Sequence, residues 1–339
     1  MTVGALEQIQ IETMTVLSKL FTAGQNVALV DFPNHENAGD SLIYLGELAY
    51  LARLGLQTGY VADHSRYNPD HLRRLVPSGP ILLHGGGNFG DRWTDFQDFR
   101  ERVISDFPDR EIIQLPQGIE FSEGPALQKA QLVLGAHPAL TLLIRDHASV
   151  ARTKELFPSA KVLFCPDMAL GYGKVETVPA PEVRLLILQR RDSESANAGN
   201  PITARNSDSH TETDWGLTGL WKLQARVLKV PGAILKRLPK LAVPFHGIQQ
   251  RCYLAQAQLN VKHAISILGS GELVATNRLH ATVLTVLMGR PVIALDNANG
   301  KISAIIRDYL GRLSGVYYAS SVDEAHLLIA EHLDAKVSA

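Results

Sequence analysis

The fold is decided by residues 27–62, which read VALVDFPNHENAGDSLIYLGELAYLARLGLQTGYVA. A short apolar run at 27–31 is followed by a helical pattern that Gly55 ends, and a second apolar run follows at 59–62. One face of the expected helix is apolar and consists of Leu42, Leu45, Leu48, Ala49 and Ala52. A strand, a helix and a strand in this order predict a βαβ crossover and a parallel sheet.

Similar short apolar runs, bounded by glycine, proline or polar residues, extend this alternation along the chain. We expect further strands at 81–84, 112–116, 140–145, 162–166, 185–189, 273–276 and 292–296, and helices near 251–268 and 281–288. A segment with Gly171, Gly173, Pro179 and Pro181 is typical of a linker. The sequence thus predicts an α/β protein with two Rossmann-like domains facing a cleft. The domains are expected at 1–175 and 182–339, with an insertion at about 193–247.

Composition narrows the class of protein. The 339 residues include 33 Lys+Arg and 34 Asp+Glu, a formal net charge of −1 that argues against a nucleic-acid partner. The two cysteines, Cys165 and Cys252, cannot form a disulfide framework, and no set of metal ligands stands out, so we expect no metal. With no basic leader and no apolar run of about 20 residues, a cytoplasmic protein is expected.

The expected insertion has two parts of different character. Residues 193–214 are rich in Ser, Asn, Asp and Thr, which favours a loop. Residues 217–245 contain no acidic residue, and their basic and apolar side chains fall on different faces of a helix. The basic face carries Lys222, Arg226 and Lys229, and the apolar face carries Leu220, Leu223, Val227 and Val230. Two interpretations stay open: contact with an anionic membrane surface, or a helix packed on the domain with a solvated basic face and broken at Pro231.

Two turns in the N-terminal half repeat one pattern, Asn37-Ala38-Gly39-Asp40 and Asn88-Phe89-Gly90-Asp91. Each follows a predicted strand and leads toward a helix, which is where open α/β sheets bind ligands. The alternative is helix capping, and for Asp40 alone we favour it.

A run of three glycines follows the predicted strand at 81–84, in His84-Gly85-Gly86-Gly87-Asn88. Such a run is costly for structure, so we expect it to expose backbone N–H groups or to leave room for a substrate. It matches neither the Walker sequence nor the dinucleotide fingerprint.

The C-terminal half places Asn277-Arg278-Leu279-His280 between a predicted strand and a helix. Arg190-Arg191 ends another strand expected at the same sheet edge, although one of these two arginines is expected to face solvent. Converging guanidinium groups suit a small dianion that carries carboxylate or phosphate.

At this point the chain resembles the polysaccharide pyruvyl transferases. The resemblance runs from about Asp31 to Lys301 and rests on an ordered series of motifs. Besides the turns, the glycine run and the Arg-Leu-His motif above, these are Pro116-Gln117-Gly118, Arg145-Asp146, Cys165-Pro166-Asp167, the strand ending at Arg190, and Gly289-Arg290-Pro291-Val292.

The resemblance implies a GT-B-like fold and transfer of pyruvate from phosphoenolpyruvate to a sugar as a cyclic ketal, with no further cofactor. Matched by motif, Arg278, Leu279, His280 and Arg190 would hold phosphoenolpyruvate, with Arg191 as the alternative to Arg190. We expect His280 to act as general acid or as a donor to the phosphate.

The acceptor would lie against the N-terminal half. The residues expected there are Asn37, Gly39, Asp40, His84, Gly85, Gly86, Asn88 and Asp91, with Asn277 joining from the other half. Asp40 or Asp91 is the candidate to accept a hydroxyl proton.

The expected acceptor is an exopolysaccharide or cell-surface glycan precursor. A lipid-linked oligosaccharide would place the protein at the inner face of a membrane. Two other functions compete: a GT-B nucleotide-sugar glycosyltransferase, and a non-catalytic subunit of glycan assembly.

Overall fold

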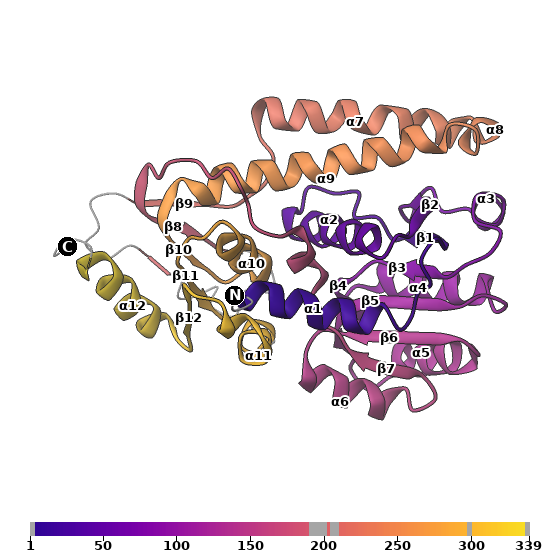
Figure 1. Cartoon of the computed structure of the whole chain (residues 1–339), viewed down its shortest axis with the longest axis horizontal. Helices are drawn as coiled ribbons and strands as arrows, with labels where there is room; N and C mark the ends of the chain where they lie inside the picture. The colour runs from indigo at the N-terminus through magenta and orange to yellow at the C-terminus, as the bar shows by residue number, and fades with distance from the viewer. Residues whose placement is uncertain (1–3, 190–201, 204–209, 297–299, 336–339) are drawn as a thin grey trace.

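The computed structural model describes residues 4–189, 202–203, 210–296 and 300–335. It contains two sheets whose strand pairs are all parallel within these ranges, with helices on their faces (Figure 1). The mixed α/β class with parallel sheets is therefore confirmed. The division into domains at 175 and 182 stays a prediction.

The first sheet has the strand order β2-β1-β3-β5-β6-β7, and β4 pairs with β5 beside this path. Its strands are β1 (Asn26–Val30), β2 (Gln57–Ala62), β3 (Ile81–Leu83), β4 (Gly86–Gly90), β5 (Ile112–Glu120), β6 (Leu140–Ile144) and β7 (Lys161–Phe164). The helices of this half are α1 (Ala5–Leu17), α2 (Ala38–Arg53), α3 (Pro69–Leu75), α4 (Thr94–Asp106), α5 (Pro125–Ala136), α6 (His147–Leu156) and the 3-10 helix η1 (Met168–Tyr172).

The second sheet has the order β12-β11-β10-β8-β9. Its strands are β8 (Val183–Leu188), β9 (His210–Thr213), β10 (Gly271–Thr276), β11 (Val292–Leu295) and β12 (Val316–Ala319). Its helices are α7 (Gly219–Arg237), α8 (Pro239–Ala242), α9 (His246–Gly269), α10 (Leu279–Leu287), α11 (Lys301–Asp308), α12 (Val322–Ala335) and the 3-10 helix η2 (Leu310–Arg312).

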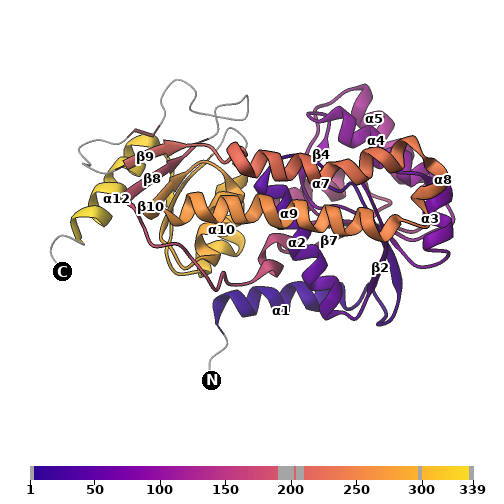
Figure 2. The ribbon, with the colours of Figure 1, turned by 90° about the horizontal axis from the view of Figure 1, so that it is seen from above.

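Alternate residues of each strand enter different cores, as the two-residue period of a strand requires. In β1, Val27 and Leu29 join a central cluster, while Ala28 and Val30 join the cluster beneath α3, α4 and α5. The central cluster also takes up Leu186 and Val274 of the second sheet. One continuous core therefore holds the two sheets together, and α9 extends along both halves (Figures 1 and 2).

Three local predictions were wrong. Ala52 of the expected apolar face is exposed. The buried residues of α2 lie on several faces of the helix between Ala38 and Leu51, because α2 packs against η1, α9 and α10 as well as the sheet. Part of the loop expected at 193–214 is the strand β9, which pairs with β8. Helix α7 continues through Pro231, because a proline removes one backbone hydrogen bond without having to end a helix.

None of the helices in the described parts of the chain has the length and apolarity that a bilayer crossing demands.

Candidate active site

Each sheet reverses its strand order at a pair of neighbouring strands, β1 with β3 and β8 with β10. Ligands in open α/β folds bind at the carboxyl ends of such strands. The segments after β1, β3 and β10 carry the predicted Asn37, Asn88 and Arg278, so the two reversal points define where the site is built.

Asn37 shapes the entry to α2. Its Oδ1 accepts a hydrogen bond from the Gly39 backbone N–H (2.9 Å), and its Nδ2 donates to Asp40 Oδ2 (2.8 Å). Asn37 is thus the cap of α2, while the Asp40 carboxylate also lies 3.5 Å from His35 Nε2. The capping role that we favoured for Asp40 was wrong, because Asn37 caps the helix and Asp40 lies at the surface of a cavity.

Most of the glycine run belongs to a strand, although we expect a run of three glycines to be a poor structural element. Residues Gly86–Gly90 form β4, which pairs with β5. A Cβ at Gly90 would lie 1.7 Å from the carbonyl oxygen of Glu120, so close strand packing requires glycine there. Asn88 is held by Arg100 Nη2 (2.8 Å) and Gln117 Nε2 (2.9 Å), which both donate to its Oδ1.

Buried polar groups stabilise the segment between β3 and β4. His84 Nδ1 lies 2.8 Å from Glu47 Oε2, and Glu47 Oε1 accepts from the Gly85 N–H (2.7 Å). Burial acts to lower the pKa of His84, but the Glu47 carboxylate outweighs it and the pKa rises to about 9. Burial lowers the pKa of Arg100 to about 10. His84 and Gly85 therefore shape the site without lining it.

The Arg-Leu-His motif lies where β10 meets α10. Arg278 is the residue before the first turn of α10, and its backbone N–H donates to Thr276 Oγ1 (3.1 Å). Its Nη2 donates to Asp214 Oδ2 (2.8 Å), and its guanidinium carbon lies 5.5 Å from the centre of the Trp215 ring. These contacts fix the guanidinium group at the edge of the cavity.

His280 approaches the first turn of α2 closely. A Cβ at Gly39 would lie 2.9 Å from His280 Cβ and 3.0 Å from His280 Nδ1. On its other side, His280 Nε2 lies 3.4 Å from Asp167 Oδ2. The ring is thus held between the start of α2 and the segment after β7.

Asp167 is a buried carboxylate that contacts Arg145 and His280. Its Oδ2 accepts from Arg145 Nη1 (2.7 Å) as well as contacting His280, and its Oδ1 accepts from the Ala169 N–H (2.9 Å). Burial alone would raise the pKa of Asp167, but His280 and Arg145 hold it well below its usual range. The carboxylate is therefore ionised across the physiological pH range.

A cavity of about 320 Å³ joins these elements, which is within the usual size of ligand sites. Its walls come from both sheets and consist of His35, Asn37, Asp40, Gly87, Asn88, Trp93, Phe96, Arg145, Trp215, Asn277, Arg278, Leu279, His280 and Lys301. Among the lining residues that the structure describes, Arg145, Arg278 and Lys301 outnumber the one carboxylate, Asp40, although each of these cations also contacts a carboxylate outside the lining. The excess of cations suits an anionic ligand.

Sequence reasoning missed six of the histidine, cationic and aromatic groups of this lining: His35, Trp93, Phe96, Arg145, Trp215 and Lys301. Arg145 belongs to a family motif, which was the available signal. Lys301 begins α11, its Nζ donates to Glu120 Oε2 (3.0 Å), and burial lowers its pKa although Glu120 opposes the shift. No motif pointed to Lys301 or Trp215.

Other predicted site residues lie elsewhere. Asp91 accepts from the Ser122 N–H (2.8 Å) and does not line the cavity. Gly86 is buried in β4. Arg190 and Arg191 lie outside the described residues. Among the described residues no group of three His, Cys, Asp or Glu side chains could hold a metal ion, and the lack of a metal requirement stays a prediction.

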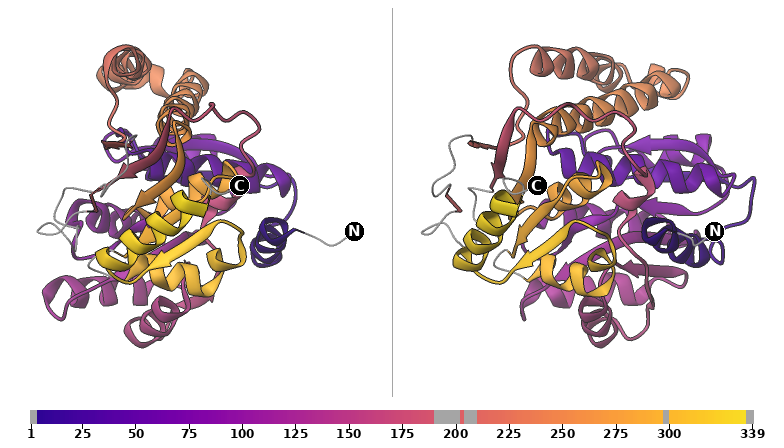
Figure 3. Two further views of the ribbon diagram at one scale, coloured as in Figure 1. Left: turned by 90° about the vertical axis from the view of Figure 1, so that its left-hand side faces the viewer. Right: turned by 60° about the vertical axis from the view of Figure 1, so that its left-hand side comes forward.

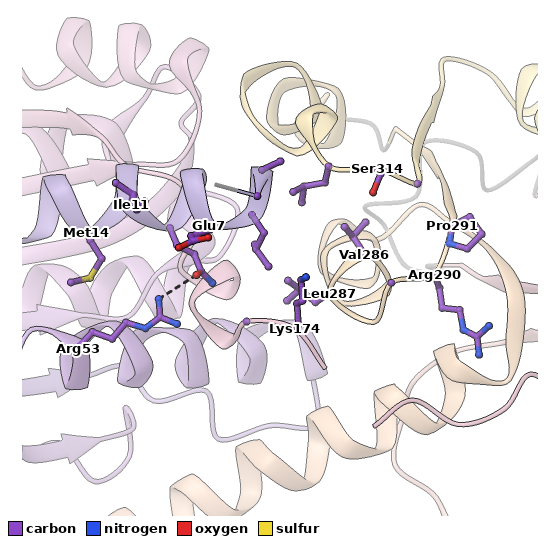
Figure 4. Close-up of a pocket in the computed structure, with 18 residues that line it drawn as sticks. Glu7, Ile11, Met14, Arg53, Lys174, Val286, Leu287, Arg290, Pro291 and Ser314 are labelled. Carbon is purple, nitrogen blue, oxygen red and sulfur yellow. Dashed lines mark hydrogen bonds between the residues drawn. The ribbon is translucent and has the colours of Figure 1, made fainter. Parts of the chain in front are cut away.

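A larger cavity, about 1020 Å³, lies between α1 and the C-terminal half (Figure 4). Two of its cations are engaged locally, because Arg53 Nη1 donates to Gln10 Oε1 (3.3 Å) and Arg290 Nη2 donates to the Pro179 carbonyl (3.0 Å). None of the described predicted site residues lines it. The cavity between the sheets is therefore the candidate active site.

The fold and this cavity define a class: a parallel α/β protein with a cation-rich cavity where the two sheets meet. The family model for polysaccharide pyruvyl transferase matches residues 37–299. The chain belongs to the polysaccharide pyruvyl transferase family.

Individual relatives agree with this assignment. "Pyruvyl transferase 1" of Schizosaccharomyces pombe is 31% identical over 336 residues, which cover 94% of this chain and 78% of the relative. EpsO of Bacillus subtilis, whose name assigns pyruvyl transfer provisionally, is 29% identical and covers 81% of this chain and 82% of its own. A crystal structure of a functionally uncharacterised Klebsiella pneumoniae protein matches with a TM-score of 0.60 at 18% identity, over 92% of this chain and 99% of that one, which shows a shared fold.

Proposed function

We propose that the protein transfers a pyruvyl group from phosphoenolpyruvate to a sugar of a glycan precursor, forms a cyclic ketal and releases phosphate. The observation that carries the proposal is the cavity that Arg145, Arg278 and Lys301 line together with His280. Phosphoenolpyruvate carries a carboxylate and a phosphate, and these cations offer partners for both. We propose that the two sheets form a GT-B-like pair of domains with the cavity as their cleft.

The proposed reaction consists of defined proton transfers and bond changes. The methylene carbon of phosphoenolpyruvate gains a proton, and one sugar hydroxyl adds to the neighbouring carbon with loss of its own proton. A second hydroxyl then attacks the same carbon, the bond to the phosphate oxygen breaks, and that hydroxyl's proton leaves with phosphate or a base. The sum is a sugar diol and phosphoenolpyruvate converted to a cyclic ketal and phosphate.

His280 is the proposed proton donor to the methylene carbon or to the departing phosphate. Asp167 orients the ring by accepting from Nε2, and Nδ1 lies on the side of Gly39 and the α2 entry. Arg278 and Lys301 stabilise the phosphate, together with Arg190 or Arg191, whose contribution is carried over from the family motif.

The acceptor is proposed to lie at Asn37, Asp40 and Asn88 on the opposite wall. Asp40, whose carboxylate is 29% exposed, is the proposed acceptor of a hydroxyl proton. The acceptor class is an exopolysaccharide or cell-surface glycan precursor, free or lipid-linked.

Incubation with phosphoenolpyruvate labelled in its pyruvyl carbons and with candidate glycans tests the proposal. Label in the glycan with an equal amount of released phosphate supports it. Release of a nucleoside diphosphate from a nucleotide sugar, without consumption of phosphoenolpyruvate, would support a glycosyltransferase instead. A non-catalytic subunit would show neither reaction, and an intact anion site would still raise its melting temperature with phosphoenolpyruvate.

A further inference from the structure

One face of helix α7 turns five large apolar side chains to solvent. Leu220, Leu223, Val227, Val230 and Ile234 recur at helical spacing, and each is 49–76% exposed. The buried residues of α7 are the small Ala225 and Gly232. The half-buried Trp221, Leu228 and Leu235 share this inner face, so α7 is apolar on both faces, whereas a surface helix normally has a polar outer face.

The outward orientation is fixed by contacts on the other face. Helix α7 packs along α9, as Figures 2 and 3 show. Arg66 Nε donates to the Gly232 carbonyl (3.0 Å), and the Trp221 ring packs edge-on against His263 at 5.2 Å. The small residues allow the two helices to lie close, so the apolar face is presented by a docked helix.

Exposed apolar side chains also follow the end of α7. Leu238, Leu241, Phe245 and Ile248, in α8 and the start of α9, are 38–50% exposed. We call these four residues and the five exposed ones of α7 the outer ridge. Many exposed apolar side chains in neighbouring elements of this kind mark an interaction site.

The charges around the outer ridge have one sign. No aspartate or glutamate occurs between Asp214 and Glu272, although the whole chain has a formal net charge of −1. The basic residues of α7 and α8 are Lys222, Arg226, Lys229, Lys236, Arg237 and Lys240. By helical position, Lys222, Arg226 and Arg237 border the apolar stripe of α7.

We propose that the outer ridge docks on an anionic phospholipid surface. The exposed leucine, valine and isoleucine side chains would enter the boundary between headgroups and acyl chains, and the bordering cations would face lipid phosphates. A second copy of the chain is a poor occupant, since a symmetric contact would bring the same cations together with no acidic partner.

The outer ridge is also connected to the active site. Asp214 and Trp215, which contact Arg278, lie only a few residues before the first turn of α7. Docking would therefore keep the cavity near the lipid surface, within reach of a lipid-linked acceptor. That consequence rests on the proposed function, whereas docking itself does not.

Flotation of the full chain with vesicles, in the absence of any substrate, tests the proposal. We expect binding to phosphatidylcholine vesicles that contain phosphatidylglycerol to be at least about tenfold tighter than to phosphatidylcholine alone. The double variant Leu223→Gln, Val227→Gln should bind the mixed vesicles about tenfold more weakly. Lys222→Gln with Arg226→Gln should weaken binding at low salt and flatten its salt dependence.

A matched control is Leu132→Gln with Leu327→Gln, which removes two leucines 75% and 66% exposed on α5 and α12. It should bind vesicles like the wild type. An absence of wild-type binding, or equal losses in the control and the ridge variant, would overturn the proposal. So would a wild-type dimer that the ridge variant converts to monomer without any vesicle binding. Each outcome is independent of pyruvyl transfer.

Discussion

Asp167 Oδ2 lies 3.4 Å from Nε2 of His280 and so joins the segment after β7 to the first turn of α10. The same oxygen accepts from Arg145 at 2.7 Å. One buried carboxylate thus sets the positions of two side chains that line the cavity from different sheets.

Replacement of Asp167 by asparagine keeps the shape and removes the charge. We expect kcat for pyruvyl transfer to fall about 100-fold, because His280 loses the partner that orients its ring. The free energy of unfolding should fall by about 3 kcal/mol at neutral pH, since Arg145 loses its buried ionic partner. Steady-state kinetics and urea unfolding measure the two effects.

The pH dependence of that stability difference has a defined sign. The pKa of Asp167 is held down in the folded protein, so the ionised carboxylate stabilises the fold above its unfolded pKa of about 3.9. This stability is lost as pH falls below that value. The difference between wild type and Asp167→Asn should be constant from about pH 7 to 5 and shrink below about pH 4. A constant difference throughout would contradict the assignment.

Gly39→Ala tests the close approach of α2 to His280. The added Cβ would lie 2.9 Å from His280 Cβ, so the ring must shift. We expect kcat to fall about tenfold or more for a displacement of this kind. Gly247→Ala is the matched control, a glycine in the first turn of α9 at which a Cβ meets nothing within 4 Å. Equal activity of the two variants would argue against a role for this approach.

Lys301→Gln and Arg278→Lys test the anion site. Each should raise KM for phosphoenolpyruvate about tenfold, because a charge or a bidentate donor is lost from the wall of the cavity. Arg152→Gln, at a side chain 45% exposed outside the cavity, is the control and should leave KM unchanged. An unchanged KM in both site variants would place the anion elsewhere.

The His84–Glu47 pair predicts a second pH effect, of opposite sign. The pKa of His84 is raised to about 9 in the folded protein, so its stabilisation is complete below the unfolded pKa of about 6.5. It is lost as pH rises through about 9. We expect wild-type stability to fall by about 3 kcal/mol over this range, and the fall to be much smaller in Glu47→Gln. Urea unfolding of both proteins at several pH values measures the two falls in stability. Equal falls in the wild type and in Glu47→Gln would contradict the role of this pair.

The strands could be predicted because parallel strands buried on both faces are short apolar runs. The predicted strands at 27–31 and 81–84 correspond to β1 and β3, and their predicted bounds differ from the observed ones by at most one residue. The strand β4 could not be found in this way. Its glycines carry no apolar signal, and it exists because glycine lets the chain approach Glu120 of β5.

The site residues could be predicted where a sequence motif lies at the edge of a predicted sheet, as at Arg278 and Asn88. They could not be predicted where the contacting side chains come from distant segments of the chain. Asp167 meets His280 across 113 residues, and Lys301 enters the cavity from the start of α11. Only packing of the two sheets around one core brings these groups together.

The most direct test of the central claim is pyruvyl incorporation from labelled phosphoenolpyruvate into an acceptor glycan by the wild type and by the double variant Arg278→Ala, His280→Ala. The account predicts label in the glycan with equal phosphate release for the wild type, and none above background for the folded double variant. Retained pyruvyl transfer by the double variant would contradict it.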